Sequence, residues 1–337
     1  MHPRILRPRP VRVLPVLAAV LVLVAVAACS GASSATGAAT ATGAATATGG
    51  AAPSGDPSRD KLAQVLARGT LVLWTDFDYA PQSFVVKDAT RAASTKCQPN
   101  QKTAPEVSGY DAETGKLVAA ELGVEPCFVT APFDSVIAGG WGDHWDVAWG
   151  SGAITASRLK SLYVTQPYYS TPANFFVAAS STVTDPKQLS GKKIGACAGC
   201  THEAYLRGTL SLPGVTLTSL VTNPQIVTYN NEPPGLADVA AGKIDAFLCS
   251  EPVGQGVIKK GVALKELTPP AFFTMKTGYL DRSLSLAPGP FIGRINAVIK
   301  GLHESGKLKA LSIQFFGTDY ATPAASFDLS AVGQTVP

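Results

Sequence analysis

A pair of cysteines, Cys197 and Cys200, is the part of the sequence best suited to chemistry, and His202 follows it closely. The pair lies between a predicted strand at 192–196 and a predicted helix at 202–210, where free backbone N–H groups favour an anion. Two thiols at this spacing can form a structural disulfide, act as a redox dithiol or help to bind zinc. No second Cys-x-x-Cys or spaced His pair accompanies them, which disfavours zinc, and no thioredoxin-like arrangement surrounds them. The two cysteines are therefore a candidate disulfide pair, and we expect His202 to be a solvated residue at the helix start.

The N-terminal segment predicts export. Arginines within residues 4–12 precede an apolar run at 13–28, which ends in small residues before Cys29. This is the pattern of a signal peptide, and the run is shorter than the about 20 residues of a membrane-spanning helix. The ending also resembles a bacterial lipobox, which implies that residues 1–28 are removed and that Cys29 is lipidated. Ordinary cleavage beside an incidental cysteine is the alternative.

The stretch at 29–58 consists almost entirely of Ala, Gly, Thr and Ser, which predicts a flexible tether between the lipid and a globular body. The full chain has 28 Lys and Arg against 24 Asp and Glu, and the signal holds four of the arginines. The mature chain is therefore neutral, which gives no electrostatic case for nucleic acid or for an acidic partner. No second long apolar stretch follows, so we expect a body anchored by lipid on the extracytoplasmic face of the cell membrane.

Export places the remaining cysteines in a compartment where disulfides form. Cys97 and Cys127 both lie in the N-terminal part of the body and are expected to bridge. Cys197 and Cys200 are a second candidate pair, which leaves Cys249 as the odd thiol.

Strand and helix patterns alternate over the whole body. Strands are expected at 70–74, 125–130, 146–149, 175–179, 192–196 and 244–248, with an extended segment at 215–221. Helices are expected at 61–68, 114–122, 133–138, 202–210, 236–241, 291–302 and 308–316. This alternation predicts an α/β architecture with mainly parallel sheets, whose ligands bind at the carboxyl ends of the strands.

Seven segments of the body follow one another in a recognisable order. They lie at 69–81, 108–123, 153–158, 165–169, 189–195, 241–246 and 306–317. Ala-Ile-Thr-Ala-Ser-Arg at 153–158 is similar to a "tiTxeR" motif, and Leu-Ser-Gly-Lys-Lys-Ile-Gly at 189–195 to a "dLxGkkvgv" motif. Together, from about residue 60 to 321, they resemble the family 3 periplasmic binding proteins, the polar amino-acid receptors of ABC importers. The cysteine pair resembles a subgroup with a Cys-x-Gly-Cys-Thr turn.

The resemblance implies a type II periplasmic-binding-protein fold, in which two α/β lobes are joined by two crossing hinge strands. Lobe 1 is expected at 59–168 and 268–337, and lobe 2 at 169–267. Closure of the lobes by a hinge motion would trap a small carboxylate-bearing solute, an amino acid or a similar compound, for delivery to an ABC permease. The resemblance implies a monomer with no cofactor, no metal and no catalytic residue.

The resemblance assigns the ligand's α-carboxylate to Arg158, because a guanidinium fork matches a planar carboxylate through two hydrogen bonds. Without the motif, a surface salt bridge would be the simpler interpretation of this arginine. Ser151 and Thr155 are implied to complete the carboxylate site, although Ala153 stands where the family commonly has Thr.

The family resemblance also suggests which residues form the walls of the ligand site. Tyr79 and Phe133 fall where the family stacks aromatic rings on the ligand, and core packing is the alternative for both. Trp149 ends a predicted strand and is added as a candidate. Cys200 and Thr201 lie at the predicted helix start, where a second contact to the carboxylate is expected.

This chain departs from the family at the position that pairs with the ligand's ammonium group. Ser250 stands where amino-acid receptors typically have an Asp. Glu251 supplies the charge if the strand end is shifted by one residue, and Asp76 is the remaining candidate. If neither reaches the ligand, a betaine or an organic acid replaces the amino acid. A sensory receptor, and an exported thiol–disulfide or dehydratase-type enzyme, are the competing functions.

Overall fold

A computed structural model describes residues 55–337 of the chain. The predicted signal peptide, Cys29 and all of the predicted tether before Gly55 lie outside this range. Within the range, no helix is both long enough and apolar enough to cross a membrane.

Eight α-helices and fourteen strands make up the described part of the chain. The helices are α1 (Lys61–Arg68), α2 (Tyr110–Leu122), α3 (Phe133–Ala138), α4 (Thr201–Leu206), α5 (Glu232–Ala240), α6 (Glu251–Lys259), α7 (Gly289–Glu304) and α8 (Lys307–Phe316). The longer strands are β1 (Thr70–Trp74), β6 (Glu125–Val129), β7 (Val147–Ala153), β9 (Tyr169–Ala178), β10 (Lys193–Cys197), β11 (Gln225–Tyr229), β12 (Ala246–Ser250) and β14 (Phe272–Asp281). The shorter ones are β2 (Asp78–Tyr79), β3 (Ser83–Val85), β4 (Lys102–Thr103), β5 (Val107–Ser108), β8 (Leu162–Val164) and β13 (Leu264–Glu266).

One mixed sheet runs through the fold in the order β11-β10-β12-β9-β14-β7-β1-β6-β4, and β2, β3 and β5 form a small second sheet. Pairing is parallel in the two outer parts of the sheet, where β1 lies between β6 and β7 and β10 lies between β11 and β12. The edge strand β4 is the exception there, because it pairs antiparallel with β6. Pairing is also antiparallel in the middle, where β9 and β14 join the two outer parts. The α/β class is therefore as predicted, whereas the expectation of mainly parallel sheets misses these central strands.

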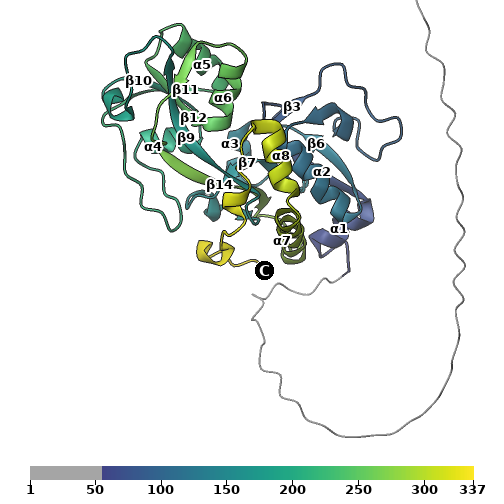
Figure 1. Ribbon diagram of the computed structural model, residues 1–337. Helices are drawn as coiled ribbons and strands as arrows, with labels where there is room; N and C mark the ends of the chain where they lie inside the picture. Colours follow the sequence, from purple (N-terminus) through teal and green to yellow (C-terminus); the bar gives the residue numbers. More distant parts are fainter. Residues whose placement is uncertain (1–54) are drawn as a thin grey trace, which may run out of the picture. The chain divides into compact units, whose positions relative to one another are not determined.

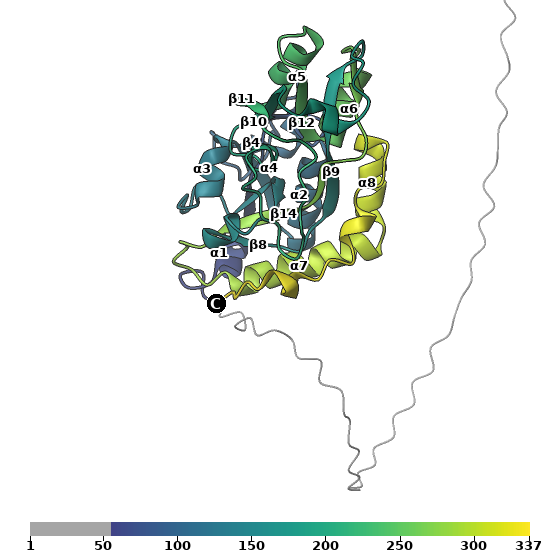
Figure 2. The same cartoon turned by 90° about the vertical axis from the view of Figure 1, so that its left-hand side faces the viewer.

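The hydrophobic core divides into two groups of clusters, which we call the first and second lobe. Tyr110, Trp149 and Phe291 belong to the first, and Phe175 and Phe247 belong to the second. Figure 1 shows α1, α2, α7 and α8 with the first lobe and α4, α5 and α6 with the second. In the view of Figure 2, α7 and α8 line one side of the first lobe. The predicted boundaries at 168/169 and 267/268 remain predictions.

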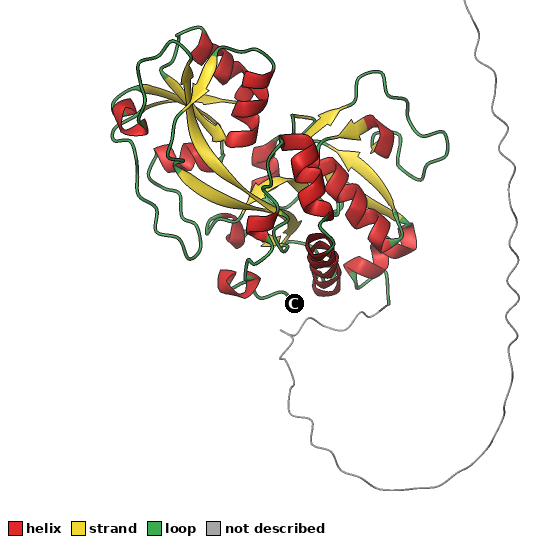
Figure 3. Cartoon of the chain, viewed as in Figure 1, coloured by secondary structure: helices red, strands yellow, loops and turns green. Residues whose placement is uncertain are grey.

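Two long strands connect the lobes. Residues of β9 from Tyr169 to Ala173 pair with β14, and the rest of β9 pairs with β12 and β13 of the second lobe. The far part of β14 pairs with β7 and β8 of the first lobe. Figure 3 shows both strands running between the two groups of helices. This is the pair of crossing strands that the family resemblance implies.

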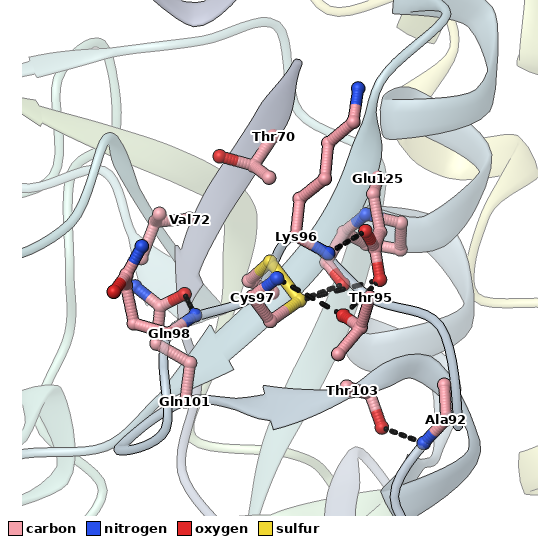
Figure 4. Close-up of a disulfide and its surroundings, with 12 residues drawn as sticks. Thr70, Val72, Ala92, Thr95, Lys96, Cys97, Gln98, Gln101, Thr103 and Glu125 are labelled. Carbon is pink, nitrogen blue, oxygen red and sulfur yellow. Dashed lines mark hydrogen bonds between the residues drawn. A yellow bond between two sulfur atoms is a disulfide. The ribbon is translucent and has the colours of Figure 1, made fainter. Parts of the chain in front are cut away.

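A disulfide between Cys97 and Cys127 fixes the irregular segment before β4 to strand β6. Figure 4 shows the neighbouring contacts, in which Lys96 N donates to Glu125 Oε2 at 2.7 Å and Thr95 bonds the same carboxylate. A second disulfide joins Cys197 to Cys200, and Cys249 is a buried free thiol. The polar segment that carries Cys97 is thus attached to the sheet by a covalent link.

Candidate ligand-binding site

A cavity lies between the two lobes, at the carboxyl ends of strands β1, β7, β10 and β11. It contains about 590 Å³ of unfilled space, including the part that opens to solvent. The first lobe and β14 contribute Trp74, Asp76, Tyr79, Phe133, Gly150, Ser151, Ala153, Arg158 and Lys276. The second lobe contributes Cys197, Ala198, Cys200, Thr201, His202, Asn230, Asn231 and Glu232. Strands from both lobes thus end at one cavity, as the general rule for α/β sheets predicts.

Arg158 opens a short 3₁₀ helix after β7 and is only 6% exposed. Its Nη1 donates to Ala153 O at 3.2 Å and to the Tyr279 hydroxyl at 3.0 Å, and its Nη2 donates to Gly199 O of the second lobe at 3.3 Å. Among the described residues it forms no ion pair. The guanidinium is therefore a buried charge held by neutral dipoles at the wall of a cavity, and the surface salt bridge is excluded for this part of the chain.

Ser151 turns the chain at the end of β7 with a φ of 58°, a conformation that is costly for any residue other than glycine. Its hydroxyl donates to Asp111 Oδ2 at 2.6 Å, and the Tyr168 hydroxyl donates to Asp111 Oδ1 at 2.9 Å. Burial raises the pKa of Asp111 to about 7, and these hydrogen bonds oppose the rise. Asp111 therefore acts from behind the cavity wall to hold Ser151 in a strained turn.

Glu232, Asp76 and Lys276 add charges around the same cavity. Glu232 is the first residue of α5 and is only 4% exposed. Its pKa is raised to about 7, mainly by burial and also by the charge of Asp76, whereas Lys276 opposes the rise. Burial also raises the pKa of Asp76, while it lowers the pKa of Lys276 to about 8 with the help of Arg158. Two acids and two cations thus line the cavity without forming a direct ion pair among the described residues.

The loop after β10 brings a disulfide and an imidazole to the second-lobe wall. Cys200 is the N-cap residue of α4, and Thr201 is its first residue. His202 is buried, with Nδ1 at 3.7 Å from Cys197 Sγ. Burial, together with the charges of Lys276 and Arg158, lowers the pKa of His202 to about 3, so the ring is neutral. The expectation that His202 is solvated was wrong, because His202 lies on the buried face of α4.

Aromatic rings form the apolar part of the first-lobe wall. The ring of Phe133 lies 6.0 Å from that of Trp74, and the Arg158 guanidinium lies 5.1 Å from the Phe133 ring centre. Tyr79 enters from β2, and its hydroxyl lies 3.0 Å from Ser250 Oγ. Phe133 therefore has two contacts at once, with the cavity and with the buried cation.

Seven of the residues predicted from the sequence to bind the ligand line this cavity. They are Asp76, Tyr79, Phe133, Ser151, Arg158, Cys200 and Thr201. The remaining four, Trp149, Thr155, Ser250 and Glu251, do not line it.

The four residues outside the cavity have other partners. Trp149 points into the core, where Nε1 donates to Thr114 Oγ1 at 3.0 Å and its ring stacks on Tyr168. Thr155 accepts from Arg158 N at 3.2 Å. Ser250 caps α6. Glu251, the first residue of that helix, is hydrogen-bonded to Tyr320, and burial raises the pKa of Glu251. The suggested one-residue shift that would bring Glu251 to the ligand is absent.

Sequence reasoning missed Glu232, Lys276 and the supporting Asp111. Glu232 stands in the polar run Asn-Asn-Glu-Pro-Pro, before the expected start of its helix at 236, whereas α5 begins at Glu232 itself. Lys276 lies in β14, a strand that the sequence patterns did not reveal. An acidic residue just before two prolines is a signal for a helix start, which was available but unused.

The fold and the cavity have counterparts among known proteins. A sequence profile of the bacterial extracellular solute-binding proteins, family 3, matches residues 71–318, and the chain belongs to this family. It is 29% identical over 222 residues to the L-arginine-binding protein of Pseudomonas aeruginosa, covering 64% of this chain and 81% of that protein. It is 25% identical over 260 residues to the L-cystine-binding protein TcyJ of Escherichia coli, covering 77% and 86%.

A solved structure with a similar fold is that of the ancestral amino acid-binding protein AncCDT-1, described as a precursor of cyclohexadienyl dehydratase. The TM-score is 0.60 at 22% identity, with 76% of this chain and 99% of that one covered. The similarity confirms the type II periplasmic-binding-protein fold.

Proposed function

We propose that this protein is an extracytoplasmic binding protein that captures a net-neutral amino acid and delivers it to an ABC importer. The observation that carries the proposal is Arg158, a buried cation at the cavity wall with no ion-pair partner among residues 55–337. Burying a charge is costly unless a counter-charge is supplied, and the carboxylate of a ligand would supply it. The amino-acid-binding relatives support the same class of solute.

The other charged residues at the cavity support a zwitterionic ligand, with both a carboxylate and an ammonium group. Glu232 and Asp76 both line the cavity and can accept hydrogen bonds from an ammonium group. They can therefore act as the ammonium partner, because Ser250 and Glu251 do not line the cavity. Glu232 and Asp76 balance Arg158 and Lys276, so a net-neutral ligand leaves the cavity neutral. A second positive charge on the ligand, as in arginine, would face Lys276 and is disfavoured.

The mode of action proposed here is lobe closure about β9 and β14, in a monomer held to the membrane by a lipid on Cys29. Support comes from the path of the described chain, which crosses between the lobes in the neighbouring strands β9 and β14. The signal and lipobox pattern of the sequence supports the lipid anchor. The permease of an ABC importer is the proposed partner because the family resemblance implies it. A sensory partner instead of a permease would use the same cavity.

Thermal-shift measurements and calorimetry on the purified protein test the proposal, with single amino acids, betaines and organic acids as ligands. A ligand that binds only the folded state adds about 2.7 kcal/mol at a hundredfold excess over Kd. Arg158→Ala should weaken binding by about tenfold or more, because a hydrogen-bonded charge contact is lost. Arg294→Ala, at an exposed arginine bonded to Glu121 O, is the matched control. Equal affinity in the two variants would contradict the assignment of the ligand's carboxylate to Arg158. If only a betaine or an organic acid binds, that compound replaces the amino acid as the proposed ligand.

One observation favours an enzyme as the second candidate. The pKa of Glu232 is raised to about 7, near the value that suits general acid–base catalysis, and Asp76 lies at the same cavity. Recovery of the bound ligand after long incubation, followed by mass spectrometry, separates the two functions. An unchanged ligand supports binding alone, and loss of water from it would support a dehydratase.

A further inference from the structure

Four side chains with metal-binding atoms meet at the second-lobe wall of the cavity. They are Cys197, Cys200, His202 and Glu232, and one ligand atom from each lies within 4.8 Å of the other three. Three come from the turn between β10 and α4, and the fourth begins α5 after β11. Because β10 and β11 are neighbouring parallel strands, both turns lie at the same edge of the sheet.

These four ligand atoms suit a tetrahedrally coordinated cation once the bond between the two sulfurs is broken. Two thiolates, an imidazole and a carboxylate are the ligand types that Zn²⁺ takes, at bond lengths of about 2.0–2.3 Å. Those bond lengths place neighbouring ligand atoms about 3.3–3.8 Å apart in a tetrahedron. His202 Nδ1 and Cys197 Sγ already lie 3.7 Å apart. Only a modest approach of the other atoms is needed, and His202 and Glu232 are each only 4% exposed.

We propose that reduction of the Cys197–Cys200 disulfide converts this wall into a binding site for Zn²⁺ or a similar thiophilic divalent cation. An external dithiol supplies two electrons and two protons, becomes a disulfide itself and leaves two thiols in the protein. The cation then replaces the two thiol protons, which pass to solvent, and is bound by both sulfurs, His202 and Glu232. A single Cys-x-x-Cys is a weak metal signal in the sequence, but the fold supplies the two further donors.

The site has a consequence that rests on the proposed function. Glu232 is the proposed ammonium partner, so a bound cation removes it from the amino-acid site. Metal and amino acid therefore exclude each other, and the redox state of one disulfide selects between them.

The test uses the full-length metal-free protein in two states, oxidised and reduced with a phosphine that is removed before titration. Co²⁺ serves as the optical probe and Zn²⁺ as its competitor. The reduced protein should bind one Co²⁺ with thiolate charge-transfer and tetrahedral d–d absorption, about a hundredfold more tightly than the oxidised protein. One equivalent of Zn²⁺ should abolish the spectrum. Equal binding in both states, or a spectrum without thiolate bands, would overturn the proposal.

Variants identify the ligands independently of amino-acid binding. Cys197→Ser with Cys200→Ser should abolish the thiolate bands while Cys97 and Cys127 are still present. His202→Ala and Glu232→Gln should each weaken Co²⁺ binding by about tenfold, as lost ligands do. Cys249→Ser, at the buried free thiol of β12, should leave Co²⁺ binding unchanged. If His202→Ala and Glu232→Gln have no effect, the site is a simple dithiol and the four-ligand assignment fails. Amino-acid titration of the oxidised protein reports on the proposed function separately.

Discussion

The Tyr79 hydroxyl lies 3.0 Å from Ser250 Oγ, and this hydrogen bond joins the two lobes beside the cavity that Tyr79 lines. Tyr79 belongs to the small sheet of the first lobe, and Ser250 ends β12 in the second. A second such contact runs from Arg158 Nη2 to Gly199 O. Both bonds can form only when the lobes are near each other, so they stabilise the arrangement in which the two lobes enclose the cavity.

Tyr79→Phe tests this role. The variant keeps the ring at the cavity and loses only the hydrogen bond, which contributes about 0.5–1.5 kcal/mol. We expect ligand affinity to fall by about two- to tenfold, mainly through faster dissociation, with unchanged stability of the ligand-free protein. Tyr229→Phe removes a hydroxyl that bonds Asp238 on the second lobe alone and should leave affinity unchanged. Equal affinity of wild type and Tyr79→Phe, measured by stopped-flow and calorimetry, would show that the contact does not contribute to closure.

Stability of the ligand-free protein should depend on pH through Glu232. Its folded pKa of about 7 lies above the ordinary carboxyl value, so the folded state binds more protons than the unfolded state between about pH 4 and 7. The free energy of unfolding therefore falls as pH rises through this window. The loss is about 3 kcal/mol and is complete above pH 7. Glu232→Gln should flatten this decline in urea titrations at pH 5 and pH 7. Asp111, whose pKa is also raised to about 7, keeps part of the slope. An unchanged slope in Glu232→Gln would contradict the assignment.

Capture of an amino acid should also release protons. An ammonium group beside Glu232 favours its ionised form and lowers its pKa, so binding at pH 6 expels part of a proton. Calorimetry in buffers of different ionisation enthalpy measures this number directly. We expect proton release at pH 6 and almost none at pH 9, with no release in Glu232→Gln. Proton uptake at pH 6 would place the ammonium group elsewhere.

Helix α6 should be sensitive to a single methyl group at Gly254. A Cβ there would lie 2.1 Å from the Phe176 ring of β9, so the helix or the ring has to move. Gly254→Ala should destabilise the protein by about 1–3 kcal/mol. Gly256→Ala lies two residues further along the same helix, where the nearest atom is 3.4 Å away, and should be neutral or stabilising. Urea denaturation of both variants gives the comparison, and equal stabilities would mean that α6 is loosely packed.

The Cys97–Cys127 disulfide should act on stability alone. It closes a loop with a sequence separation of 30, which corresponds to about 3–4 kcal/mol of unfolded-state entropy. Cys97→Ser with Cys127→Ser should lower the free energy of unfolding by about that amount and leave ligand affinity unchanged, because neither residue lines the cavity. A change in affinity of more than about threefold would link this disulfide to the binding site.

The sequence predicted the segments whose local signals and tertiary packing agree. Asp60 caps α1 through hydrogen bonds to Leu62 N and Ala63 N, and Gly69 ends it in the left-handed conformation. The buried strand at 70–74 and the helix at 133–138 have the predicted bounds. In these places the local sequence signals are sufficient to predict the structure, because packing favours the same conformation.

Elements decided by packing escaped prediction. Helix α6 contains one proline and two glycines, which disfavour a helix, yet it covers β9 and β12. Strand β14 mixes polar and apolar residues without alternation because its neighbours change along its length. The segment at 215–221 was expected to be extended and has only an isolated bridge at Val215.

The same limit applies to the site. Family resemblance located Arg158 and six other cavity residues, because their motifs lie on the first-lobe strands and in the Cys-x-Gly-Cys-Thr turn. Glu232 and Lys276 could not be found in this way. Each becomes a cavity residue only when β11 and β14 reach their places in the sheet.

The pairing of Ala173 with Phe272 makes the second lobe an insertion. The chain leaves the first lobe and returns to it through two adjacent strands, so everything between them is a cassette with its own hydrophobic core. A cassette whose ends lie side by side can be exchanged between relatives without altering the strands that carry Arg158. Half of the cavity wall, including Glu232, would be replaced in one step while Arg158 is retained.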